Sequence, residues 1–172
     1  AGAEDSSGRH KGYLEELNMP PGSRTPTFAA AVLNIKNWRW DGVPFFMRAG
    51  KALETKLCEV RICFKPTPAN IFSGFDNGQW PDELVIRIQP DEVIYFKIIN
   101  KVPGLKVSLA QCMLDMQYSA VFAKPIPDAY ECLLLDVLEG DKTMFVSTPE
   151  RAALWDVFTP VLHEIDKRQV RP

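Results

Sequence analysis

The sequence has few of the residues that build metal centres or supply catalytic bases. It contains two histidines, His10 and His163, and its four cysteines include no Cys-x-x-Cys pair. No metal site is therefore expected, because the usual nitrogen and sulfur ligand sets are missing. The cysteines are Cys58, Cys63, Cys112 and Cys132. We expect all four to be reduced thiols, because they lie inside segments predicted to be strands or helix.

Long apolar runs and an excess of one charge are also missing. The chain has 20 basic and 22 acidic residues and a formal net charge of −2. Nucleic-acid binding requires a basic field that this balance does not provide. No run of 18 apolar residues suggests a membrane span, and the polar N-terminus lacks the apolar centre of a signal peptide. We expect a soluble, cytoplasmic protein that binds neither nucleic acid nor membrane.

Motifs for self-sufficient catalysis are absent as well. The sequence contains no G-x-x-x-x-G-K-[ST], no G-x-G-x-x-G, no G-x-S-x-G and no H-E-x-x-H. His163 lies among apolar neighbours of a predicted helix, where a structural role is the more common one. No catalytic residue is predicted in this chain.

The apolar content of 46% is enough for a folded core, and its spacing indicates the fold class. Residues 27–118 are predicted to form a sheet, because most of this region alternates between apolar and polar residues. The strands are expected at residues 27–36, 43–47, 58–64, 84–89, 92–100 and 113–117. Helices are predicted at residues 127–139 and 149–167, with Thr148 as a possible cap and Pro160 as a kink. The predicted class is α+β, a large mainly antiparallel β-sheet with helices packed on one face.

The domain organisation follows from composition. Residues 1–26 are rich in Gly, Ser, Pro and charge, which predicts an extended wrapping segment. Residues 27–165 are predicted to be a single domain, and residues 166–172 a charged tail that ends abruptly. One sheet face is expected on the core. The other is expected to be solvated or covered by a ligand, a domain or a second subunit.

Residues 41–56 combine an apolar strand, a glycine and two lysines. Gly50 follows the strand and permits either a close backbone approach or a positive φ. Lys51 and Lys56 come next. A cation at the end of a buried strand could meet an anionic or polyhydroxylated ligand, but ordinary solvated lysines explain the same spacing.

Strand parity aligns a second group of charges. Arg61, Arg87 and Lys97 share the face opposite the apolar one, with Tyr95 and Asp115 of the same parity. Such a group suits a nucleotide, because guanidinium groups bind phosphate in bidentate fashion and a tyrosine ring can stack on a base. The alternative is a lattice of surface ion pairs in which these cations pair with Glu59, Asp91 and Asp115.

Several motifs, in order along the chain, carry a family resemblance. They are Trp-Asp-Gly-Val-Pro-Phe-Phe-Met-Arg-Ala-Gly-Lys-Ala-Leu, Glu-Val-Arg-Ile-Cys-Phe, Asp-Glu-Leu-Val-Ile-Arg-Ile-Gln-Pro, Pro-Asp-Ala-Tyr-Glu-Cys-Leu-Leu-Leu-Asp and Trp-Asp-Val-Phe-Thr-Pro-Val-Leu. Between Lys11 and Ile165 the sequence resembles the C-terminal domain of glucose-6-phosphate dehydrogenase. The resemblance implies an enzyme of the oxidative pentose phosphate pathway that oxidises glucose 6-phosphate to 6-phosphogluconolactone with NADP.

The resemblance also implies roles for particular residues. Lys51 matches a lysine that reaches the sugar, Lys56 a nearby basic contributor, and Gln89 a further substrate contact. The family's dinucleotide-binding domain and its catalytic base precede the matched region. The chain alone is therefore expected to be inactive.

A second, structural NADP is implied for this domain in some family members. The matching positions are Arg61, Arg87, Tyr95, Lys97 and Asp115. Two departures bear on this site: Leu57 stands where such members often have lysine, and the sequence stops at residue 172, before the family's C-terminal tail. The sheet is also the family's subunit interface, which implies a homodimer or tetramer.

A different class of function is compatible with the same residues. A freestanding anion-binding, nucleotide-binding or assembly module could share the fold without the chemistry. A natural start near residue 1 would favour this alternative, whereas a preceding segment with a Gly-rich strand, turn and helix would favour the enzyme.

Overall fold

The computed structural model describes residues 4–5, 8–9, 11–75, 80–122 and 127–170. His10 and the last two residues of the predicted tail lie outside the described residues. The first 26 residues contain a 3₁₀ turn, Tyr13–Glu15, and a short pairing of β1 (Glu4–Asp5) with β2 (Gly8–Arg9). Between them and β3, the described residues form turns and irregular backbone, in keeping with the prolines at positions 20, 21 and 26.

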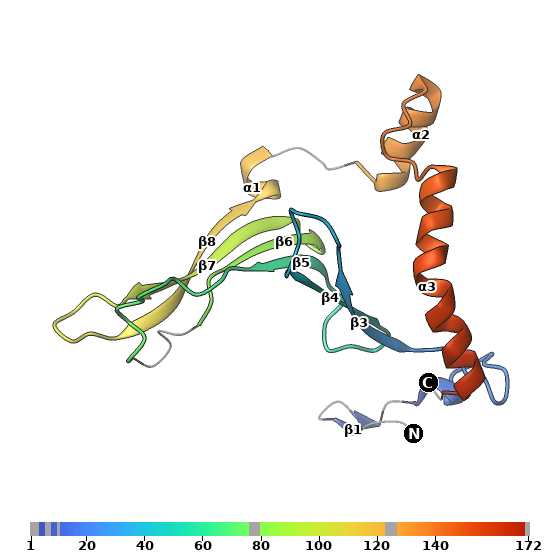
Figure 1. Cartoon of the computed structure of the whole chain (residues 1–172), viewed down its shortest axis with the longest axis horizontal. Coiled ribbons are helices and arrows are strands. Elements are labelled where there is room, and N and C mark those ends of the chain that lie inside the picture. The colour runs from blue at the N-terminus through green and yellow to red at the C-terminus, as the bar shows by residue number, and fades with distance from the viewer. Residues whose placement is uncertain (1–3, 6–7, 10, 76–79, 123–126, 171–172) are drawn as a thin grey trace. The chain divides into compact units, whose positions relative to one another are not determined.

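All strand pairings are antiparallel, as predicted. β3 (Phe28–Asn34) pairs with β4 (Pro44–Gly50), from Phe28 opposite Gly50 to Asn34 opposite Pro44. A four-stranded sheet has the order β5-β6-β7-β8. Its strands are β5 (Cys58–Cys63), β6 (Glu83–Gln89), β7 (Val93–Lys101) and β8 (Leu109–Gln117). Figure 1 shows these four strands curving together in sequence order.

The six strands were expected in one sheet, and the described residues place them in separate sheets of two and four strands. Close contacts also divide the chain into two compact units. Unit 1 comprises Ala1–Leu53 with Asp136–Pro172, and unit 2 comprises Glu54–Leu135. The β3-β4 ladder belongs to unit 1 and the four-stranded sheet to unit 2. The single domain predicted for residues 27–165 stays a prediction.

The helices match their predicted positions closely. α2 (Ala129–Glu139) ends before Gly140, whose φ of +76° is the left-handed conformation that ends many helices. α3 (Thr148–Arg168) contains Pro160. Its cap differs from the prediction, because Ser147 rather than Thr148 accepts a hydrogen bond from the Glu150 N–H, and the Glu150 carboxylate accepts one from the Ser147 N–H. A short helix not predicted from the sequence, α1 (Tyr118–Phe122), follows β8 and contacts it.

The buried residues of unit 2 lie on the face opposite the predicted one. The small buried cluster consists of Val85, Val93 and Tyr95, which share strand parity with the charged residues. The apolar face is largely exposed: Phe96 is 40% exposed and Leu114 61%. Other exposed members of that face are Val60, Ile62, Phe64, Ile88 and Met116. Among the described elements of unit 2, α1 has a small contact with β8 and no helix packs broadly on the sheet, so this apolar face receives no broad cover from within the unit.

Candidate functional site

Lys51 directly follows β4 in unit 1. Its backbone N–H donates to the Thr27 carbonyl at 2.8 Å, which extends the β3-β4 ladder by one bond. The next residue, Ala52, has a φ of +51°, so the chain turns sharply after the lysine. The Lys51 side chain is exposed. The backbone at this position is therefore fixed while the ammonium group faces solvent.

Gly50 allows neighbouring side chains to pack closely against the backbone, and its φ is not in the left-handed region. A Cβ at this position would lie 2.8 Å from the Phe28 Cδ2 atom and 3.3 Å from the Leu53 Cδ2 atom. Phe28 is also the strand partner of Gly50. The phenyl ring thus fills the space that a larger residue before Lys51 would need.

Lys56 and Gln89 meet in unit 2. They line a pocket of about 460 Å³ together with Leu57, Cys58 and Pro90. Cys58 and Gln89 are register partners at the ends of β5 and β6, which explains why residues far apart in the sequence share this pocket. The peptide bond between Gln89 and Pro90 is cis. Two of the three predicted substrate contacts are therefore brought together, while Lys51 belongs to unit 1.

The predicted nucleotide residues form a row across the four strands. In the register of the sheet, Arg61 on β5 pairs with Val85 on β6. Val85 in turn pairs with Tyr95 on β7, and Tyr95 pairs with Asp115 on β8. Arg87 and Lys97 have the same parity and flank this row. We call six charged residues of this face, Glu59, Arg61, Glu83, Arg87, Lys97 and Asp115, the charged face.

Carboxylates already pair with two of the three predicted cations. Arg61 forms an ion pair with Glu59 on its own strand and lies 3.3 Å from a Glu83 carboxylate oxygen on β6. The same oxygen lies 3.6 Å from the Lys97 Nζ atom on β7. The ion-pair lattice considered as the alternative is therefore present only in part. Glu59 pairs with Arg61 along one strand, and the cross-strand pairs are made by Glu83, which the alternative did not include. Among the described residues, Asp91 and Asp115 form no ion pair.

Arg87 differs from the other two cations. Its guanidinium carbon lies 5.8 Å from the centre of the Tyr95 ring, and its buried Nε atom has no hydrogen-bond partner. Within the part of the chain that the structure describes, Arg87 makes no ion pair. Tyr95 is only 7% exposed, so a base could not stack on its ring without moving the side chains over it.

Two pKa values on the charged face follow from these contacts. Burial acts to lower the pKa of Arg61, but the hydrogen bond and charge of Glu59, with the charges of Tyr95 and Glu83, raise it overall. Burial raises the pKa of the Cys63 thiol, and the adjacent Glu83 carboxylate raises it further. Arg61 is therefore a permanent cation, and Cys63 is held in its protonated form.

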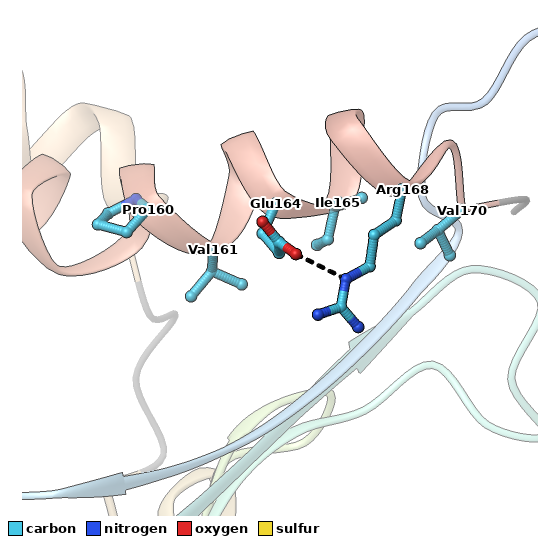
Figure 2. Close-up of a pocket in the computed structure, with 6 residues that line it drawn as sticks. All are labelled: Pro160, Val161, Glu164, Ile165, Arg168 and Val170. Atoms are coloured by element: carbon cyan, nitrogen blue, oxygen red, sulfur yellow. Dashed lines mark hydrogen bonds and ion pairs between the residues drawn. The ribbon is translucent and has the colours of Figure 1, made fainter.

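A second pocket lies along α3 in unit 1. It has a volume of about 420 Å³ and is lined by Pro160, Val161, Glu164, Ile165, Arg168 and Val170. Figure 2 shows Glu164 and Arg168 one turn apart, joined by an ion pair at 2.7 Å, with Val161 and Val170 to either side. This pocket contains no residue predicted to bind a ligand.

Sequence reasoning missed Glu83, the residue that joins two cations. The predicted strand began one residue later, at Leu84, although parity with Arg87 would have placed Glu83 on the charged face. Within the described ranges, no cluster of three or more His, Cys, Asp or Glu side chains could hold a metal ion. In the same ranges, no helix is long and apolar enough to cross a membrane.

Comparison with known proteins places the sequence in one family. The family model described as glucose-6-phosphate dehydrogenase, C-terminal domain, matches residues 1–172. Glucose-6-phosphate 1-dehydrogenase 3, chloroplastic, from Arabidopsis thaliana is 53% identical over 163 residues, which cover 93% of this chain and 27% of that protein. The cytoplasmic isoform from Solanum tuberosum is 46% identical over 166 residues, which cover 96% of this chain and 32% of that protein.

Solved structures agree with this assignment. A structure described as glucose-6-phosphate dehydrogenase in complex with its substrate glucose-6-phosphate matches with a TM-score of 0.80 and 40% identity. The match covers 94% of this chain and 33% of that chain. This chain thus spans 27% to 33% of the length of these relatives, and the predicted α+β class is confirmed. The chain belongs to the glucose-6-phosphate dehydrogenase C-terminal domain family.

Proposed function

We propose that this chain is the C-terminal part of a glucose-6-phosphate dehydrogenase, which oxidises D-glucose 6-phosphate to 6-phosphogluconolactone and reduces NADP. The observation that carries the proposal is the family match over all 172 residues. It is supported by the 40% identity to a structure described as a complex with glucose 6-phosphate. In this proposal, the catalytic base and the coenzyme domain belong to the part of the relatives that this chain does not span.

The substrate contacts proposed for this chain are Lys51, Lys56 and Gln89. Lys51 combines a backbone fixed by the β3-β4 ladder with an exposed ammonium group, as a donor to a sugar hydroxyl requires. Lys56 and Gln89 line one pocket, where an ammonium and an amide can hold a phosphorylated sugar by charge and by hydrogen bonds.

A second NADP, bound for structure rather than for hydride transfer, is proposed for the charged face. Arg87 fits this role because it forms no ion pair within the described part of the chain, and Arg61 and Lys97 can approach an anion from the neighbouring strands. Tyr95 would act through its contact with Arg87, and Asp115 accepts a hydrogen bond from Gln117 on the same strand.

The exposed apolar face of β5-β8 supports assembly as a homodimer or tetramer through the sheet. A cytoplasmic location remains our proposal as well. The relatives include both cytoplasmic and chloroplastic forms.

The proposal is tested by substituting Lys51 in the full-length enzyme. Lys51→Ala should reduce kcat/KM for glucose 6-phosphate roughly 5- to 150-fold, because the substrate loses a charged hydrogen-bond donor. This change corresponds to a loss of about 1–3 kcal/mol of transition-state stabilisation. Steady-state kinetics at saturating NADP measure this loss. Lys36→Ala is the matched control, because Lys36 is an exposed lysine just after β3. Equal kinetics for Lys51→Ala and the control would remove Lys51 from the site.

A further inference from the structure

Glu83 places one carboxylate oxygen between two cations on different strands. Its Oε2 atom lies 3.3 Å from Arg61 Nη1 on β5 and 3.6 Å from Lys97 Nζ on β7. Glu83 begins the strand between them, directly opposite Lys97 in the β6-β7 ladder. The carboxylate therefore occupies the position that a bound phosphate oxygen would need in order to contact both cations.

The contacts of Glu83 are of a kind that a ligand can displace. The side chains of Arg61, Lys97 and Glu83 are 42%, 22% and 20% exposed, respectively, so water and ions reach them. Solvent screening weakens ion pairs that water reaches, so a competing anion can displace them. A ligand with two or more negative charges can replace one carboxylate charge and still gain attraction from both cations.

Arg87 supplies an independent observation that the charged face can accept an anion. Its buried Nε–H has no partner, and the guanidinium is held over the Tyr95 ring. Glu59, its register partner on β5, also has a buried carboxylate oxygen without a hydrogen bond, while its other oxygen pairs with Arg61. Among the described residues, the cations of this face are thus unequally neutralised: Arg61 and Lys97 form ion pairs with carboxylates, and Arg87 forms none.

We propose that Glu83 is an internal counter-anion that competes with a phosphate-bearing ligand for Arg61 and Lys97. The inference rests on the anion-binding role proposed for the charged face. Glu83 lowers the affinity of this face for all anions. It also selects for polyanions such as a diphosphate, because a monoanion gains too little to displace a carboxylate from two cations. Glu83 is in this sense a specificity-determining residue rather than a ligand contact.

The test is a calorimetric titration of the full-length protein with pyrophosphate. Ionic strength is held constant, and glucose 6-phosphate is saturating so that the sugar phosphate site is filled. Glu83→Gln should lower the Kd by roughly three- to tenfold, since it removes one charge that pairs with two cations. Adding Arg61→Ala to Glu83→Gln should cancel most of this gain. Glu83→Ala is a second variant, for the case in which glutamine disturbs the strand end.

Glu164→Gln is the matched control, because it removes a carboxylate that pairs with Arg168 within α3 of unit 1 and makes no ion pair with Arg61 or Lys97 among the described residues. It should leave the Kd unchanged. An unchanged or higher Kd in both Glu83 variants, or no pyrophosphate binding by any of the proteins, would overturn the inference. Turnover of glucose 6-phosphate by the same unmodified protein tests the proposed enzyme separately, because the reaction does not depend on Glu83.

Discussion

Cys63 ends β5 beside Glu83, and this neighbour affects the chemistry of its thiol. The Sγ atom lies 3.7 Å from a Glu83 carboxylate oxygen. Burial raises the thiol pKa above its ordinary value of 9.0, and the Glu83 charge and hydrogen bond raise it further. Because the folded state holds this thiol proton more tightly than the unfolded state, the contribution of Cys63 to stability is fully present below pH 9. It is lost as the pH rises through the folded pKa.

Removing the Glu83 charge should therefore lower the pKa of Cys63. In Glu83→Gln, alkylation of Cys63 by iodoacetamide at pH 8 should be about two- to fivefold faster, because the thiolate fraction increases. Peptide mass spectrometry over a time course measures the rate, with the exposed Cys58 in the same chain as the internal reference. An unchanged ratio of the two rates would contradict the role assigned to Glu83.

The candidate residues themselves could be identified from parity and from motif. Parity placed Arg61, Arg87, Tyr95, Lys97 and Asp115 on one face, and the register confirms this arrangement. Alternation within one strand does not specify which residues of two strands pair, because the pairing depends on how the strands are aligned with each other. For this reason the position of Glu83 between Arg61 and Lys97 becomes apparent only in the structure.

At the scale of elements, α3 is a helix whose start is fixed by side chains. Ser147 and Glu150 satisfy each other's backbone N–H groups, and Pro149 lies in the first turn, where its missing N–H costs nothing. Lys167 and Arg168 occupy the last turn, where positive charge is favourable. The bounds of α3 were therefore predictable from sequence to within about a residue.

The cap gives a prediction that distinguishes two adjacent residues. Ser147→Ala should destabilise the first turn of α3 by about 1 kcal/mol, because the Glu150 N–H loses its acceptor. Hydrogen exchange of the Glu150 amide should then be about fivefold faster. Thr148→Ala is the control and should leave exchange nearly unchanged, since Thr148 is the first helical residue and not the cap. Equal effects of the two substitutions would refute the observed cap.

The apolar face of β5-β8 shows what pattern reasoning does not determine. Alternation correctly assigned apolar and charged residues to opposite faces, as the 6.4 Å separation of the Phe64 and Phe96 rings illustrates. The same pattern also predicts that the apolar face forms the core, whereas the buried cluster of Val85, Val93 and Tyr95 lies on the opposite face. Alternation shows which side chains share a face of the sheet, but it does not show which other surface packs against that face.

At the scale of the molecule, exposed apolar side chains occur in both units. On α3, Trp155 is 60% exposed and Leu154 51%, while Leu114 represents the exposed face of the sheet. A protein that functions alone rarely leaves so many large apolar side chains in water. This agrees with a chain that spans only about 27% to 33% of the length of its relatives.

The isolated 172-residue chain should consequently be inactive and should bind apolar dyes. We expect no reduction of NADP in the presence of glucose 6-phosphate. We also expect anilinonaphthalene sulfonate fluorescence, per mole of chain, several-fold above that of the full-length enzyme, because the dye reports exposed apolar surface. Absorbance at 340 nm and dye titration measure the two properties. Turnover by the pure fragment, or dye binding equal to that of the full-length enzyme, would contradict this expectation.

The position of Val85 has a consequence for engineering. Val85 is fully buried and lies in register between Arg61 and Tyr95, so the small core of unit 2 and the charged face share one surface of the sheet. A designer could not vary the electrostatics of this surface and the packing beneath it as independent parameters. A library that seeks altered anion preference should therefore keep Val85, Val93 and Tyr95 fixed and diversify only the charged positions around them.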